Sequence, residues 1–239
     1  MSLALYDTGA LRFWTEREIM LREHFAARTV ASVCSSLKGI NTAWQSYRCE
    51  GPLITPRDRI SASYDENDVF ILQAPLAGGQ AVMRPETTPS SYAYAFSLLN
   101  SSEIRPPAIV WQIGKSFRRE TNDGASPSKL RFNEFYQLEL QCIYRSDSKA
   151  DYRAAVIGPL TDELGKCCNS EARIVESDRL PFYSVRTDDI ELLWNGEFKE
   201  VCSISTRNDF PVLKSGLALS VLEVAVGMDR LVCVAEQKV

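Results

Sequence analysis

The sequence predicts one α+β domain over residues 1–239, built on an antiparallel β-sheet flanked by helices. Segments with a strand pattern outnumber helical segments and mostly follow one another along the chain, which is typical of antiparallel sheets. A long helical pattern lies near the N-terminus. No internal repeat or low-complexity linker divides the chain, and 45% hydrophobic residues suffice for a sizeable core.

Charge and cysteine content limit the function classes. The 27 Lys and Arg against 31 Asp and Glu give a net charge of −4, which argues against a broad nucleic-acid-coating surface. No apolar run approaches the roughly 20 residues that span a bilayer, so we expect a cytoplasmic protein without membrane contact. The seven cysteines form no C-x-x-C pair and predict reduced thiols. His24, the single histidine, lies in a helical pattern and not beside a nucleophile.

The first half of the chain begins with a helix signal. Thr15 and Glu18 form a capping-box pattern, and Gly39 is a plausible terminator of the helix that follows. Thr88 and Pro89 predict the N-cap and first position of a second, short helix. The other elements expected in this half are strands at 44–49, which Gly51-Pro52 ends, and at 69–73.

The second half reads mostly as strands. Asn195-Gly196 predicts a hairpin turn, and Pro159 predicts a kink within a helix. Strands are expected at 109–113, 171–176, 182–187, 190–194, 198–206 and 219–226, with helices at 148–168 and from Gly227 onward.

The stretch from Gln112 to Glu139 is the most informative part of the sequence. Two strand-like segments flank a polar loop at 121–129, and Arg118 and Glu120 share one face of the first. The second segment alternates, with Phe135, Gln137, Glu139 and Gln141 opposite Tyr136, Leu138, Leu140, Cys142 and Tyr144. The apolar face predicts core. The charged face fits either a solvated hairpin or a ligand site, and its charge density favours the ligand site.

Five segments, in order, carry a resemblance to a known family: "MRPETT", "QIGKSFRRE", "LRFNEFYQLEL", "KEVCSISTRNDF" and "VLEVAVGMDR". Together they resemble the catalytic core of class II aminoacyl-tRNA synthetases, most closely the glycyl type. The resemblance implies a dimerisation helix and strand at 15–60, the family's second motif at 109–145 and its third motif at 217–236. It also implies a homodimer.

The same resemblance implies a reaction and its cofactors. Enzymes of this family use ATP and Mg²⁺ to convert an amino acid, here a small glycine-like one, to an aminoacyl-adenylate. Arg118 would hold the α-phosphate and the substrate carboxylate together, and Arg230 would cover the adenine and reach the γ-phosphate. These two arginines are the expected catalytic residues. The remaining implied ATP and metal ligands are Glu120 on the adenine amino group, Phe135 stacked on the base, Arg131 on a phosphate, and Glu223 with Glu200 on Mg²⁺.

The implied amino-acid site is only partly of the glycyl type. Glu86 and Glu139 match the carboxylates that hold the substrate amino group, and Arg207 matches an arginine of the family. Ala225 stands where the family has a serine. Pro89-Ser90 and Ser203 also replace family residues, namely Gln-Gly and a glycine.

The acceptor stays open between tRNA and the thiol of a carrier protein. The chain stops shortly after the third motif, with no anticodon-binding domain, which is expected of either a free-standing relative or an excised core. A non-catalytic accessory or regulatory subunit is the alternative function. A biotin-ligase-like or asparagine-synthetase-like enzyme is a third, which the "RPETT" and "KEVCSIS" segments disfavour.

Overall fold

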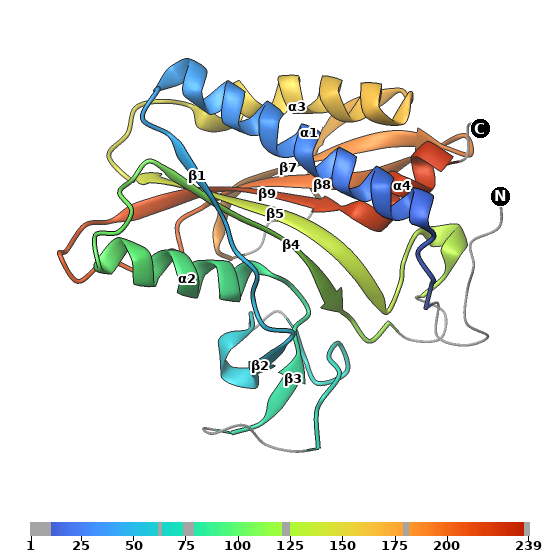
Figure 1. The fold of residues 1–239 in the computed structure, drawn as a ribbon, viewed down its shortest axis with the longest axis horizontal. Helices are drawn as coiled ribbons and strands as arrows, with labels where there is room; N and C mark the ends of the chain where they lie inside the picture. The colour runs from blue at the N-terminus through green and yellow to red at the C-terminus, as the bar shows by residue number, and fades with distance from the viewer. Residues whose placement is uncertain (1–10, 62–63, 74–78, 121–124, 179–181, 237–239) are drawn as a thin grey trace.

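A seven-stranded sheet with helices on both faces forms the centre of the protein (Figure 1). The computed structural model describes residues 11–61, 64–73, 79–120, 125–178 and 182–236. The strand order is β1-β4-β5-β9-β8-β7-β6. Only β1 and β4 pair in parallel, and all other neighbours in this sheet are antiparallel. The predicted α+β class is confirmed.

The bounds of the elements follow the predicted order closely. The strands of the large sheet are β1 (Gln45–Arg48), β4 (Ala108–Phe117), β5 (Glu134–Arg145), β6 (Ala172–Glu176), β7 (Ser184–Trp194), β8 (Glu197–Arg207) and β9 (Leu219–Gly227). A separate two-stranded sheet joins β2 (Ile54–Pro56) to β3 (Ala81–Met83). The helices are α1 (Glu16–Ile40), α2 (Thr88–Asn100), α3 (Tyr152–Cys168) and α4 (Met228–Glu236), with short 3₁₀ turns at Arg57–Arg59 and Pro127–Lys129.

The predicted capping box opens α1. The hydroxyl of Thr15 accepts the N–H of Glu18 at 3.3 Å, and the Glu18 carboxylate accepts the N–H of Thr15 at 2.8 Å. The predicted end of the helix is too early, because Gly39 lies inside it. Asn41 is the C-cap, and its N–H donates to the carbonyl of Leu37.

Two other expectations need correction. Residues 69–73 form only an isolated bridge between Ile71 and Val82, and not a strand of their own. The two strands expected at 182–187 and 190–194 are one strand, β7, with pairing irregularities that broke its alternating pattern. The Asn195-Gly196 turn is confirmed. Its residues have φ of 51° and 82°, as a two-residue hairpin turn requires.

The two faces of the central sheet differ in chemistry. One face packs under α1, α3 and α4, and its core includes Leu138, Leu140, Ile204 and Val224. The other face is partly covered by α2 (Figure 1). It carries Glu139 and other buried polar residues at the alternate positions. The predicted division of β5 into an apolar and a polar face is therefore confirmed. Among the described helices, none combines the length and apolarity needed to cross a membrane.

Candidate active site

Buried polar side chains cover the α2 face of the three central strands. Strand pairing places Gln141 of β5, Glu223 of β9 and Ser205 of β8 side by side. All three are at most 7% exposed, as are Glu139 and Arg207 on the same face. Burying such groups costs free energy unless each finds a partner, so a row of them marks a site better than it marks a core.

Glu223 is the centre of a hydrogen-bond network. Its Oε2 accepts from Nη1 of Arg207 at 2.8 Å, from Nε2 of Gln141 at 2.9 Å and from the hydroxyl of Thr88 at 3.1 Å. Arg207 also donates to both carboxylate oxygens of Asp209, at 3.0 and 2.6 Å. Arg207 thus links the buried Glu223 to the exposed Asp209.

Glu139 lies next to this network and is also held by hydroxyl groups. Thr87 donates to its Oε2, and Thr88 lies 3.0 and 3.1 Å from its two oxygens. Burial, with the negative charge of Glu223, raises the pKa of Glu139 to about 8. The hydroxyl of Thr88 lies between Glu139 and Glu223 and can donate its single proton to only one of them at a time. Protonation of Glu139 therefore reduces the electrostatic repulsion between the two carboxylates.

Glu86 completes what we call the carboxylate cluster, made of Glu86, Glu139 and Glu223. Burial and the charge of Glu223 raise the pKa of Glu86, against the opposing effect of Arg118 and Arg207. The phenol of Tyr64 lies 3.5 Å from one Glu86 oxygen, at the limit of a hydrogen bond. The Glu86 carboxylate also accepts a backbone hydrogen bond from Ser61, which acts to lower its pKa.

Arg118 lies just beyond the end of β4, not within it as the alternation predicted. Its Nε donates to the carbonyl of Pro85 at 3.1 Å, and its guanidinium lies 5.4 Å from the ring of Tyr64 and 5.3 Å from that of Phe135. Burial works against its charge, but Tyr64 and Glu86 outweigh this effect and raise the pKa of Arg118. A permanent cation thus stands beside the carboxylate cluster.

The other predicted nucleotide and metal ligands pair with one another. Arg131 lies 3.7 Å from the carboxylate of Glu120. Arg230 lies 3.4 Å from the carboxylate of Glu200 and donates to its backbone carbonyl at 2.8 Å. The side chains of Arg131 and Glu200 are 43% and 49% exposed, so these ion pairs stabilise the fold little. Within the described ranges, no group of three or more acidic, histidine or cysteine side chains is arranged to hold a metal ion.

Two cavities adjoin the predicted residues. The larger has a volume of about 810 Å³ and lies among β2, the start of α2 and the ends of β7 and β8. Its wall includes Glu86, Arg207 and Thr88, together with many apolar side chains.

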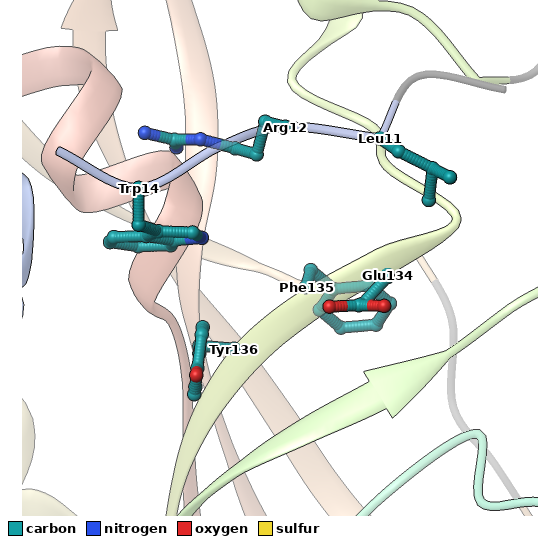
Figure 2. Close-up of a pocket in the computed structure, with 6 residues that line it drawn as sticks. All are labelled: Leu11, Arg12, Trp14, Glu134, Phe135 and Tyr136. Atoms are coloured by element: carbon teal, nitrogen blue, oxygen red, sulfur yellow. The ribbon is translucent and has the colours of Figure 1, made fainter. Parts of the chain in front are cut away.

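The smaller cavity, of about 80 Å³, lies where the segment before α1 crosses the start of β5 (Figure 2). Leu11, Arg12 and Trp14 line it from one side and Phe135 from the other. Arg12 forms ion pairs with Glu18 and, at 3.4 Å, with Asp229 at the start of α4. The N-terminal segment is thereby fixed against the strand that carries the predicted adenine-stacking ring.

Comparison with known proteins fits this geometry. No protein-family model matches the chain. The glycine–tRNA ligase of Lachnoclostridium phytofermentans is 29% identical over 138 residues, which are 54% of this chain and 28% of the relative. That of Mycoplasmopsis synoviae is 27% identical over 170 residues, 62% and 37% of the two chains. That of Thermobifida fusca is 29% identical over 177 residues, 64% and 38%.

The chain resembles the catalytic core of glycine–tRNA ligases. The resemblance that five sequence segments predicted is thus confirmed. The chain spans about a third of the length of the curated relatives it matches.

For a glycine–tRNA ligase-like core, the register explains where Ala225 lies. Ala225 lies in β9, where it is paired with Glu139 of β5 on one side and with Ser203 of β8 on the other. A serine at this position would therefore lie directly beside the carboxylate cluster.

Sequence reasoning missed three residues of the site: Tyr64, Thr87 and Thr88. Thr88 was predicted to cap α2, but Thr87 is the N-cap residue and neither hydroxyl caps the helix. Both hydroxyls donate to Glu139 instead, because a buried carboxylate needs hydrogen-bond donors to offset its desolvation. Thr87 and Thr88 directly follow Glu86 in "PETT", and this proximity to a predicted site residue could have indicated that they belong to the site. The sequence around Tyr64 carried none.

Proposed function

We propose that the protein activates an α-amino acid with ATP, forming an aminoacyl-adenylate and pyrophosphate, and then transfers the aminoacyl group to an acceptor. The observation that carries the proposal is the position of Arg118 between the ring of Phe135 and the carboxylate cluster. The positive charge of Arg118 would attract the substrate carboxylate and the α-phosphate of ATP, and the neighbouring carboxylates would attract the substrate ammonium group. The resemblance to glycine–tRNA ligases supports the same reaction class, and taken by itself it favours a small glycine-like amino acid.

Formation of the adenylate requires the protein mainly to stabilise the negative charges of the reacting groups. The substrate carboxylate attacks the α-phosphorus, the bond to the bridging oxygen breaks, and pyrophosphate leaves with the electron pair. Because the nucleophile is already an anion, no general base is needed, and positioning with charge stabilisation supplies the rate. Arg118 can donate to both reacting anions through its planar fork. Of its side-chain nitrogens, Nε already donates to Pro85, which fixes the orientation of the plane.

Glu86 and Glu139 would hold the substrate ammonium group. Both carboxyls have raised pKa values because they are buried near Glu223. A bound ammonium group would favour their ionised forms, so substrate binding would release protons near neutral pH. Arg207 neutralises Glu223 and prevents three buried negative charges from facing one another.

ATP would be held by Phe135 under the base and by Glu120, Arg131 and Arg230 around it. In the structure the three charged residues are engaged in ion pairs, and Arg131 and Glu120 pair with each other. Nucleotide binding would therefore exchange these exposed ion pairs for contacts with adenine and phosphate, at little cost in stability. The carboxylates of Glu200 and Glu223 are hard oxygen ligands of the kind that suits Mg²⁺, which would supply positive charge to the phosphates.

The remaining parts of the proposal concern assembly and setting. The segment 15–60 would form the interface of a homodimer, because it exposes apolar side chains, namely Ile19, Met20, Ile40 and Leu53. The acceptor would be tRNA, as the name of the relatives suggests, with a carrier-protein thiol as the alternative. A cytoplasmic setting agrees with seven cysteines that are all free thiols.

ATP–pyrophosphate exchange with a panel of the common amino acids tests this function. We expect exchange that depends on Mg²⁺ and on at least one amino acid. Absence of exchange with every amino acid, in protein shown to be folded, would reject the enzyme.

A non-catalytic accessory subunit is the second candidate, and the pairing of Arg131 with Glu120 and of Arg230 with Glu200 favours it. Such pairs would satisfy these side chains without any ligand. Calorimetric titration with Mg·ATP separates the two functions, since only the enzyme requires tight binding that is lost in the Arg118→Ala variant.

A further inference from the structure

The cavity of about 810 Å³ is far larger than a glycine-like substrate needs. Glycine has only a hydrogen atom as its side chain, whereas cavities of about 300–1,000 Å³ hold ligands of drug size. The cavity begins at Glu86, which belongs to the carboxylate cluster, and extends between β2 and α2. Space is therefore available immediately beside the group that would bind the substrate ammonium.

The wall of this cavity is mostly apolar. Tyr92 and Phe96 of α2 form one side, Ile54 of β2 another, and Phe182 with Tyr183 the side next to β7. Ile54 is 41% exposed and Phe182 is 79% exposed, so both retain apolar surface that a ligand could bury.

The polar groups in the wall are mostly committed to the protein itself. Arg84 donates to the backbone carbonyls of Lys115, Gly51 and Pro52. Arg207 is shared between Glu223 and Asp209, and Asp209 also accepts from the phenol of Tyr92 at 3.1 Å.

Glu86 differs, because it lines the cavity and no ion pair joins its carboxylate to a cation among the described residues; it accepts a backbone hydrogen bond from Ser61 and has a long contact of 3.5 Å from the phenol of Tyr64. Arg59, which is exposed, also lines the cavity without an ion-pair partner among the described residues. The Glu86 carboxylate next to a largely apolar chamber fits a ligand that has an ammonium group joined to an apolar body.

We propose that the amino acid accepted at this site carries a bulky apolar side chain, branched aliphatic or aromatic, which fills the chamber between Ile54, Tyr92, Phe96 and Tyr183. The inference rests on the proposed function in one respect: the ammonium group binds at Glu86, with Arg118 nearby for the carboxylate. The side chain then points away from β9 and toward α2. The substrate class therefore departs from the glycine in the name of the relatives.

Calorimetric titration of the whole chain with glycine, leucine and phenylalanine, without ATP, tests the inference. Burying an apolar side chain should tighten binding of leucine or phenylalanine roughly 10-fold or more over glycine. Ala93 is an exposed residue of α2 that lines the chamber, so Ala93→Trp should fill it. We expect this variant to lose the preference for the larger amino acids while it still binds glycine.

The matched control is Ala154→Trp, which adds the same ring to an exposed position of α3, on the opposite face of the sheet. This variant should keep the preference. Ala93→Phe, a smaller change, should lower the preference partially and guards against a folding defect in Ala93→Trp. Glycine binding equal to or tighter than that of leucine and phenylalanine would overturn the inference, as would a preference that survives Ala93→Trp or no binding of any of the three.

Exchange assays on the same panel separate this inference from the proposed function. Selective binding of leucine or phenylalanine without any ATP–pyrophosphate exchange would reject the proposed amino-acid activation. It would still support the chamber as the binding site of an apolar side chain. Exchange that is fastest with glycine, and unchanged by Ala93→Trp, would retain the enzyme and reject the chamber.

Discussion

Arg207 of β8 donates to Glu223 of β9 at 2.8 Å, and both side chains are at most 10% exposed. The pair lies on the polar face of the sheet, where Gln141 and Thr88 supply further donors to the same carboxylate oxygen. Removing one partner of such a pair leaves a buried charge without compensation, which costs much more than the pair itself contributes.

Arg207→Met should therefore lower the free energy of unfolding by about 3–5 kcal/mol. Urea denaturation followed by circular dichroism measures the change. Arg186→Met is the control, because Arg186 is 49% exposed and Asp188 keeps a second partner in Arg153. The control should cost less than about 1 kcal/mol. Similar losses in both variants would show that Glu223 does not depend on Arg207.

Protonation of Glu139 predicts how stability depends on pH. Its pKa is raised to about 8 in the folded protein, against about 4.3 for an ordinary glutamate. The folded state therefore binds this proton more tightly than the unfolded chain. The resulting stability is fully present below the unfolded pKa and is lost as pH rises through the folded pKa.

Glu139→Gln should remove this contribution, so the variant's stability should fall less than that of the unaltered protein between about pH 5 and pH 8. Urea titrations at a series of pH values provide the test, with the exposed Glu66→Gln as control. If the two variants follow the same pH dependence, Glu139 does not carry the proton.

Arg118→Ala should lower the rate of ATP–pyrophosphate exchange by about 100-fold or more, since it removes the cation that would stabilise the developing charge. Arg119→Ala is the matched control. Arg119 is adjacent in the chain but exposed, and its backbone N–H, which the substitution preserves, donates to the carbonyl of Asp68. Equal activity of the two variants would remove Arg118 from the catalytic role.

Arg230→Ala should weaken binding of Mg·ATP about 10-fold and lower the free energy of unfolding by only about 1–2 kcal/mol, because the lost contacts are a partly exposed ion pair with Glu200 and hydrogen bonds to the backbone carbonyls of Leu130 and Glu200. Calorimetry gives the affinity and a thermal melt gives the stability. Lys199→Ala, which breaks an exposed pair with Glu197 on the same strand, should change neither. A large loss of stability with normal nucleotide affinity would make Arg230 a structural residue.

Met20→Glu should convert the proposed dimer to a monomer in light scattering. Met20 is 67% exposed on α1, and a charge there opposes burial in an interface. Val212→Glu alters an equally exposed apolar residue outside the segment 15–60 and should leave the dimer intact. A protein that is monomeric before any substitution would contradict the proposed assembly.

Local patterns predicted most of the fold because they depend on neighbours in the chain. The capping box of Thr15 and Glu18, the turn at Asn195 and the two faces of β5 all have this origin. The single strand β7 was missed because its irregular pairing interrupts the alternation that marks a strand.

The site was predicted less completely, since it depends on which distant residues meet. Glu139 could be read from β5 as a charge on a buried strand, and the resemblance brought in Glu86. No local pattern showed that Thr87 and Thr88 would turn to Glu139, or that Tyr64 would lie under Arg118. These contacts arise from tertiary packing, which overrides the local preference of a threonine for a helix cap.

Because β5 has one apolar and one polar face, its register in the sheet matters as much as its composition. Both faces of this strand are buried between Leu138 and Ile143, one as core and one as site. Deleting or inserting one residue before Leu138 would reverse the faces, sending Glu139 under α1 and α3 and a leucine into the carboxylate cluster. A strand of this kind tolerates exchange of one side chain for another far better than any change in its length.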